Sequence, residues 1–232
     1  MSEEQILSYQ VEPFQTEDRP RRFLEAFSAI LKHSNYGPVL DFYTRVSAKC
    51  SRCTAACQVY QASGDPRDIP CHRSELLFRV YRRYFTLAGE VKARLYDSFV
   101  LTDEHIDEMA EEYWRCTACK RCKATCPMGI EHGMITHLAR WILAEIDVAP
   151  KAMVVSVREQ LEGDSKNTSA IPAIAMKDTC EFLEEEIEEE YPGAGVKFPM
   201  DVEDSEYVFF PAVSDYLMEA ETLMGNAAML HV

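Results

Sequence analysis

Four cysteines crowd into one short run of this 232-residue chain, CTACKRCKATCP, which ends at Pro127. The thiols of Cys116, Cys119, Cys122 and Cys126 have the spacing C-x2-C-x2-C-x3-C-P. In this spacing three thiolates can reach three irons of one compact cube, and the fourth points elsewhere. Small residues between the thiols let backbone N–H groups approach the sulfurs and stabilise their charge. The run therefore predicts a 4Fe–4S cluster and a fold that surrounds it.

A second group of cysteines lies upstream in CSRCTAAC, which supplies Cys50, Cys53 and Cys57. This run departs from the ferredoxin pattern because Ala56 stands where the third thiol would usually fall, so that the third thiol comes one residue late. A more distant thiol, Cys71 in IPCHR, is available as a fourth ligand. Together the two groups provide eight thiols, which is enough for two 4Fe–4S clusters.

The eight thiols can be divided between two clusters in more than one way. In two-cluster ferredoxins the fourth cysteine of a run ligates the other cluster, so we predict a crossed division. One cluster takes Cys50, Cys53, Cys57 and Cys126, and the other takes Cys116, Cys119, Cys122 and Cys71. An uncrossed division, in which each group keeps its own four thiols, fits the count nearly as well. A 3Fe–4S cluster in the first site is a further alternative, for a fold in which Cys71 does not reach it.

Composition excludes several other classes of protein. The chain has 39 Asp and Glu against 24 Lys and Arg, and this net charge of −15 opposes binding to nucleic acid or anionic lipid by bulk electrostatics. No apolar run reaches the length of a membrane span, and the start MSEEQILSYQ has no hydrophobic signal core. We therefore expect a cytoplasmic protein, in which nine cysteines indicate metal or redox chemistry rather than disulfides. Four-cysteine zinc sites usually consist of two separated C-x2-C pairs, which the crowded run does not match.

Three other features near the thiols are less specific. Cys180 stands alone in an acidic segment, and we expect a buried thiol there. His72 and His132 flank the ligand runs. Either could be a cluster ligand or a proton acceptor, but we favour packing or surface residues. A basic group either offsets the cluster charge, docks an acidic redox partner or is simply solvated. It consists of Lys120, Arg121 and Lys123.

Helical periodicity dominates the rest of the chain and predicts a mainly α fold. Ser74 and Thr102 are expected to cap helices that begin beside them. The one convincing strand covers Tyr207 to Phe210. Helices are expected within residues 21–33, 74–85, 102–114, 134–142, 150–163, 178–191 and 215–230.

The arrangement of the two runs resembles the iron–sulfur subunit of heterodisulfide reductases. SELLFRVYRR follows the first run and TDEHIDEMAEEYWRC leads into the second, and the resemblance covers about Phe42 to Ile146. The same module stands at the front of related glycolate, lactate and glycerol-phosphate oxidoreductases. The stretch FLEEEIEEEYPGAGVKFPMDVEDSEYVFFPAVSDYL is similar to the segment that joins this module to a cysteine-rich CCG domain. Ala212 and Val213 stand where such relatives often have a cysteine, and no CCG motif occurs before Val232.

This resemblance implies an electron-transfer subunit with two 4Fe–4S clusters in an α-helical ferredoxin-like domain, rather than a catalyst on its own. The implied partners are a flavoprotein, a CCG-domain subunit, and a quinone-reactive membrane subunit that would attach the complex to the inner membrane. One alternative is the front part of a longer CCG-type reductase or oxidase whose catalytic cysteines lie outside this chain. Another is a metal-stabilised scaffold or redox sensor.

The expected domains follow from the same resemblance. They are an N-terminal helical segment (1–40), the two-cluster domain (41–147), a helical linker with an acidic helix (148–204), and a strand–helix unit resembling the start of a CCG domain (205–232).

Overall fold

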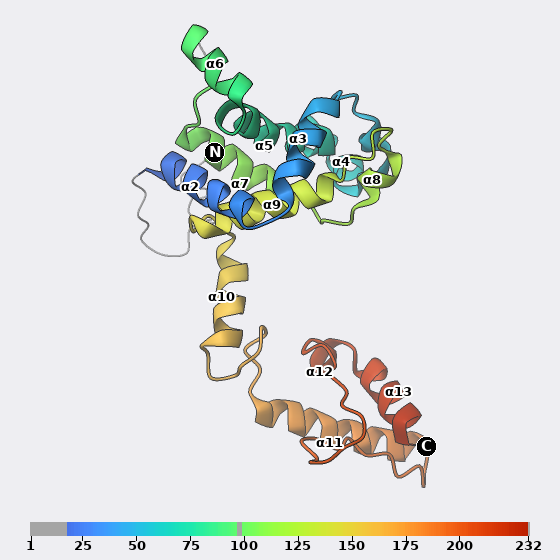
Figure 1. Ribbon diagram of the computed structural model, residues 1–232. Helices are drawn as coiled ribbons and strands as arrows, with labels where there is room; N and C mark the ends of the chain where they lie inside the picture. Colours follow the sequence, from blue (N-terminus) through green and yellow to red (C-terminus); the bar gives the residue numbers. More distant parts are fainter. Residues whose placement is uncertain (1–17, 97–98, 232) are drawn as a thin grey trace. The chain divides into compact units, whose positions relative to one another are not determined.

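Every regular element of the computed structural model is a helix in the residues that it describes, 18–96 and 99–231 (Figure 1). The predicted mainly α class is confirmed, and residues 1–17 of the expected N-terminal segment lie outside the described part. The contacts between residues divide the chain into two units, Met1–Lys151 and Ala152–Val232. The helices are α2 (Arg19–Lys32), α3 (Tyr36–Val46), η1 (Arg52–Ala56), α4 (Gln58–Ser63), η2 (Pro66–Asp68), α5 (Pro70–Tyr84), α6 (Leu87–Leu95), α7 (Asp103–Trp114), α8 (Arg121–Thr125), α9 (His132–Glu145), α10 (Lys151–Leu161), α11 (Ala173–Glu190), α12 (Asp215–Met218) and α13 (Ala220–His231).

The first unit has its main core between α2, α5, α7 and α9, with α3 against α2 and α5. Each of these helices repeats apolar residues at helical spacing, and the resulting stripes face one another. Phe23 and Phe27 of α2 are fully buried, and the ring of Phe27 lies 4.7 Å from that of Phe85. This core contains no thiol among its buried members, so it does not depend on metal ligands for its apolar packing.

The fully buried Tyr113 links α7 to α5. Its hydroxyl donates to the carbonyl of Arg73 at 2.8 Å and accepts from the N–H of Leu77 at 3.2 Å. The buried hydroxyl therefore both donates and accepts and is not left unpaired. These two hydrogen bonds fix the position of α7 along α5. Helix α5 contains Cys71, and α7 ends two residues before Cys116.

The two expected helix caps have different outcomes. Thr102 caps α7 as predicted, in a capping box completed by His105. The cap at Ser74 is wrong, because α5 begins four residues earlier at Pro70, whose fixed φ suits the first helical position. Ser74 is instead buried in α5, and its hydroxyl lies 2.8 Å from Nδ1 of His132. The earlier start places Cys71 in the first turn of α5.

Glu112 on α7 is a buried carboxyl, 4 % exposed, whose pKa is raised to about 7. Burial is the main cause and Glu108 adds to it, while Arg73 and Arg67 lower the pKa. Since the folded state has the higher pKa, folding takes up a proton between about pH 4.5 and pH 7. The stabilising contribution is complete below that window and is lost as the pH rises through it.

Replacing Glu112 with glutamine should therefore flatten the pH dependence of stability. We expect the free energy of unfolding of the unaltered protein to fall, relative to Glu112→Gln, by roughly 2–3 kcal/mol from about pH 4.5 to about pH 7.5, because each unit of pKa shift corresponds to about 1.4 kcal/mol. Urea unfolding of both proteins at the two pH values measures the difference. A constant difference across the window would contradict the assignment.

The second unit is described by itself. Helix α11 packs against α12 and α13. Its buried side chains include Leu183 and Ile187, as their spacing predicts, and Cys180, which is 4 % exposed as expected for a buried thiol.

The strand predicted at Tyr207–Phe210 is wrong, because no strand occurs in the described residues and this segment is irregular. Phe210 is 87 % exposed, so the β-forming composition has no neighbouring strand with which to pair. The single helix expected over 215–230 is also interrupted, since Glu219 leaves helical geometry at φ −133° and ψ 48° between α12 and α13.

Candidate metal centre

The two cysteine runs fold into the same local shape. The segments RCTAAC and RCKATC form η1 and α8, each followed by an extended cysteine. Each begins after a left-handed residue, Ser51 at φ 58° or Lys120 at φ 61°, and ends at Cys57 with φ −87° or Cys126 with φ −77°. The matching hydrogen bonds to the Ser51 and Lys120 carbonyls are both 3.0 Å long. The two runs are therefore structural repeats of one another.

The similarity extends upstream to the residue that precedes Cys50 in the first run and Cys119 in the second run. Lys49 and Ala118 are also left-handed, at φ 50° and φ 53°. Left-handed residues alternating with right-handed ones turn successive backbone N–H groups toward one side and form a concavity that suits an anion. Neither repeat uses glycine at these positions, so the left-handed conformations carry a steric cost that the surrounding structure must offset.

The matching backbone geometry shows which cysteines of the two runs are equivalent. Cys50, Cys53 and Cys57 correspond to Cys119, Cys122 and Cys126, in that order. The upstream run therefore lacks the first cysteine of the ferredoxin pattern, and its third thiol does not come one residue late as the spacing suggested. Cys116 is the extra thiol of the second run, and Cys71 is the available counterpart for the first.

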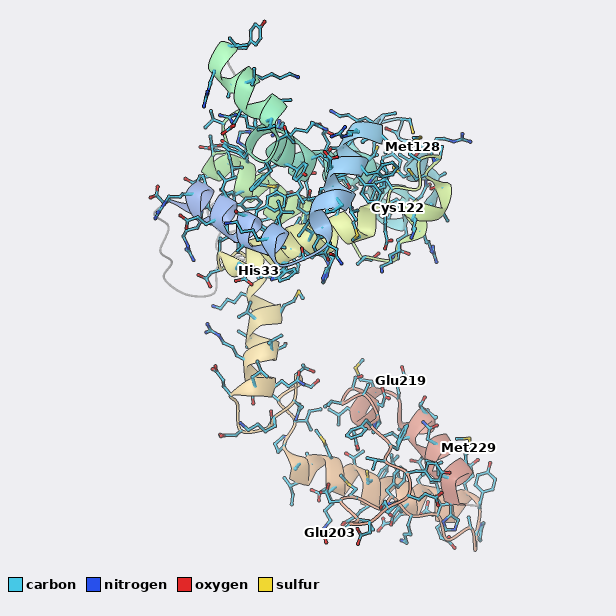
Figure 2. The ribbon with its side chains drawn as sticks, in the orientation of Figure 1. His33, Cys122, Met128, Glu203, Glu219 and Met229 are labelled. Atoms are coloured by element: carbon cyan, nitrogen blue, oxygen red, sulfur yellow. The ribbon has the colours of Figure 1, made fainter. Side chains whose placement is uncertain are left out.

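One cavity brings together thiols from both runs. It is lined by Cys57 of the first run and by Cys116, Cys119 and Cys122 of the second. Helix α8 packs directly on η1, which explains why the last thiol of one run reaches the first three of the other. Figure 2 labels Cys122 in this region of the first unit, with Met128 farther along the same segment.

A second set of thiols lies beside the first. Cys53, Cys71 and Cys122 pack together around Ile69. A hydrogen bond between the thiols of Cys53 and Cys71 lowers the pKa of Cys71 to about 6 and raises that of Cys53. The Cys71 sulfur also lies 3.9 Å from the Ser51 hydroxyl. Cys71 is thus next to the first run, whereas the division predicted from the sequence put it with the second.

The two remaining thiols border these groups. Cys126 is half-buried and packs against the main apolar core, and Cys50 is exposed. The predicted division placed Cys57 with Cys50 and Cys53, but the cavity brings it to Cys116. Cys57 is thus the thiol of the first run that lines the cavity together with thiols of the second run.

The donor set around the cavity fits an iron–sulfur cluster. The N–H of Ala118 donates to the Cys116 sulfur at 3.4 Å, and the N–H groups of Arg121 and Gly133 point to Cys119 and Cys122. Such donors are the groups that stabilise a charged cluster and its thiolates. Among the described side chains no group of three His, Cys, Asp or Glu is tight enough for a single metal ion.

Burial and neighbouring thiolates make the Cys122 thiol hard to ionise. Burial raises the pKa of Cys122 to about 11, and the neighbouring charges of Cys116 and Cys119 add to the effect. At exposed Cys119 the backbone N–H of Arg121 lowers the pKa. Bound iron would relieve the repulsion between thiolates, because it places positive charge between them.

A buried ionic network around Asp68 holds together the segments that carry the candidate ligands. The carboxylate of Asp68 is fully buried and accepts from Arg73 at 3.2 Å, from Arg115 at 2.6 Å and from the Ser63 hydroxyl at 2.6 Å. The backbone carbonyl of Asp68 accepts from the Cys57 thiol at 3.6 Å. One residue therefore connects the segment that carries Cys57 with the residue before Cys116. Sequence reasoning missed this role, since the link to Arg115 spans 47 residues of the chain.

Arg140 on α9 fastens the entry to the second run. Its guanidinium donates to the carbonyl of Tyr113 at 2.7 Å and to that of Cys116, and it lies 4.8 Å from the ring of Trp114. These bonds add to the one that the Tyr113 carbonyl accepts from the N–H of Cys116 at 3.3 Å, where α7 ends. They also hold the backbone of a candidate ligand. Periodicity alone marks Arg140 only as a polar residue of α9.

The flanking histidines make hydrogen bonds with serines. His132 is buried at the start of α9, and burial followed by the charge of Arg73 lowers its pKa to about 4. His72 places Nε2 3.2 Å from the Ser51 hydroxyl. In the basic group of the second run, Lys120 and Lys123 both pair with Glu131.

Residues 48–130 match the family model of the 4Fe-4S dicluster domain. Over these residues the chain is similar to 4Fe–4S dicluster domains. Its cofactors are two 4Fe–4S clusters, as predicted from the thiol count. The matched residues include both structural repeats and Cys71.

Curated relatives of the dicluster domain are iron–sulfur subunits. The chain is 31 % identical over 136 residues to the Hdr-like menaquinol oxidoreductase iron-sulfur subunit 2 of Archaeoglobus fulgidus, covering 58 % of this chain and 24 % of that protein. It is 30 % identical over 134 residues to the Hdr-like menaquinol oxidoreductase iron-sulfur subunit of Archaeoglobus profundus, with the same coverage. It is also 30 % identical over 105 residues to the glycolate oxidase iron-sulfur subunit of Escherichia coli, covering 45 % of this chain and 21 % of that protein. The resemblance to heterodisulfide-reductase-type iron–sulfur subunits is confirmed for this region.

The aligned region spans about a quarter of the length of these curated relatives. No solved structure matches the chain significantly. Among the described helices, none is both long and apolar enough to cross a membrane.

Proposed function

We propose that this chain relays single electrons through its two clusters, between a flavin, quinone or ferredoxin-side partner and a catalytic partner. The observation that carries the proposal is the pair of structural repeats packed against each other, with thiols of both runs around one cavity. The clusters supply one-electron chemistry when bound. A chain that holds two of them in contacting elements is suited to pass electrons from one to the other. We further propose a cytoplasmic location, where such thiols stay reduced until iron binds.

We also propose a division of ligands that differs from the one suggested by the sequence. Support comes from the lining of the cavity, from the contact between Cys53 and Cys71, and from the repeat symmetry. If Cys57 crosses to the second run, its equivalent Cys126 crosses to the first. One cluster is then held by Cys57, Cys116, Cys119 and Cys122, and the other by Cys50, Cys53, Cys71 and Cys126.

Other residues of the chain would tune these sites. The backbone N–H groups of Ala118, Arg121 and Gly133 donate toward thiolates of one site, which lowers the energy of added negative charge. The guanidinium of Arg140, bound at the Cys116 carbonyl, adds a positive charge beside the same site. Both effects stabilise the reduced state relative to an uncharged apolar surrounding.

Serine substitutions test the division of ligands. Cys57→Ser should perturb the same cluster as Cys116→Ser, and Cys126→Ser should perturb the same cluster as Cys71→Ser. Electron paramagnetic resonance and Mössbauer spectra of the anaerobically reduced variants distinguish the two clusters. Cys180→Ser is the matched control and should leave both spectra unchanged. The division fails if Cys57→Ser alters the cluster that Cys50→Ser alters.

The relay itself is tested by reduction and by isolation of partners. We expect dithionite to bleach the broad visible absorption of both clusters, and native purification to recover a second redox subunit. Clusters that dithionite cannot reduce, together with a chain recovered without redox partners, would favour a scaffold role instead.

A further inference from the structure

The surface beside the clusters has an unusual charge. Residues 45–64 and 115–130 contain no Asp or Glu, although the chain has 39 of them. These two stretches hold the structural repeats, and η1 and α8 pack together within them. The basic face, as we name it, consists of exposed side chains from both repeats, Lys49, Arg52, Lys120, Arg121 and Lys123.

Ion pairs neutralise only part of the basic face. Glu131 pairs with both Lys120 and Lys123, and Glu75 pairs with Lys49. Within the described residues no ion pair is formed by Arg52 or Arg121. The face therefore keeps positive charge in a protein whose net charge is −15.

The two arginines occupy equivalent positions in the repeats. Arg52 immediately precedes Cys53, and Arg121 immediately precedes Cys122. Each also lies two residues after an exposed thiol, Cys50 or Cys119. The positive charge thus surrounds the points where candidate ligands of both sites reach the surface, which is where an electron would have the shortest path to another protein.

We propose that the basic face docks an acidic one-electron carrier protein, with Arg52 and Arg121 as its two principal contacts. This proposal rests on the proposed relay function and names the class of one partner. In the exchange one electron moves between a cluster and the carrier's redox centre, one side being oxidised as the other is reduced, and no bond or proton is transferred. Opposite charges speed such encounters and orient them, and salt weakens the effect.

The test compares two double variants of the cluster-loaded protein. Arg52→Gln with Arg121→Gln removes the unpaired charges of the basic face. Lys92→Gln with Arg94→Gln removes two exposed charges from α6 and is the matched control. The probe is a plant-type 2Fe–2S ferredoxin chosen for its strongly acidic surface, and binding is measured by calorimetry at about 20 mM and about 500 mM salt.

We expect the arginine pair to weaken ferredoxin binding about tenfold at low salt, and the α6 pair to change it less than twofold. At high salt the difference between the two variants should vanish. Equal effects of the two pairs, or binding that salt does not alter, would overturn the proposal. Binding of the unaltered protein to phosphatidylglycerol vesicles but not to ferredoxin would also overturn it, in favour of a lipid surface.

Failure of docking and failure of the relay give different results. If dithionite reduces both clusters in every variant but the ferredoxin results contradict the expectation, docking alone is wrong. If the clusters cannot be reduced, the relay function is wrong whatever the ferredoxin binding shows. Visible spectra of the variants also report directly whether the substitutions disturbed cluster loading.

Discussion

Replacing Asp68 with alanine is expected to destabilise the dicluster domain by about 3–5 kcal/mol. The substitution removes the buried carboxylate that Arg73 and Arg115 share. Arg73 is 1 % exposed, so its guanidinium would remain buried without its anionic partner at Asp68. Alanine keeps the backbone carbonyl that accepts from Cys57, but Ser63 at the end of α4 and Arg115 before Cys116 would lose the carboxylate they share, and cluster content should fall with stability.

Asp65→Ala is the matched control for this prediction. Asp65 pairs with the same Arg115, at 3.3 Å, and also with Arg67, but it lies near the surface. We expect a much smaller loss of stability, because solvent screens an exposed pair. Urea unfolding and iron content of the anaerobically purified proteins measure both variants. Similar losses for the two would show that the buried network has no special weight.

Removing the clusters is expected to open the ligand segments and leave most of the helical core folded. The thiols contribute to a small group around Ile69, whereas the main core is built from apolar residues of other helices. Oxidation in the presence of a chelator should therefore increase tryptic cleavage after Arg52 and Arg121 on the order of tenfold, because these segments lose their cross-links.

The core gives the internal control for this experiment. Cleavage after Arg140 should stay slow, since its side chain is held against the end of α7. Far-ultraviolet circular dichroism should keep most of its helical signal. Complete and simultaneous loss of that signal on cluster removal would contradict the prediction and show that the metal sites hold the whole unit together.

Local patterns predicted much of the fold and of the ligand inventory. The stripe of α2 and the cap at Thr102 depend on neighbours within one or two turns, so the sequence determines them directly. Ser74 was misread because a serine before an apolar run looks like a cap, although Pro70 opens the helix earlier. The segment at Tyr207–Phe210 has strand-forming side chains, but a strand also requires a partner that composition does not reveal.

Spacing alone does not decide how the thiols are divided between the clusters. Counting cysteines leaves several pairings open, and the correspondence of Cys57 with Cys126 appears only when the backbone of η1 is compared with that of α8. The support from Asp68 and Arg140 was missed for a related reason. Arg115 lies 47 residues from Asp68 and Tyr113 lies 27 residues from Arg140, and a single sequence holds no signal of such contacts.

The cavity that joins Cys57 to Cys116 also has a topological consequence. Residues 58–115 lie between these two thiols and contain α5 and α7. Bonds from both thiols to one cluster would close this segment into a ring, as a disulfide does, and would restrict the unfolded chain. Helices α5 and α7 already pack together and are joined through Tyr113, which brings the ends of the segment toward each other. Packing of the apolar core thus brings the two ends of this segment close together. Iron would then add a covalent link between ends that the helices already hold near each other.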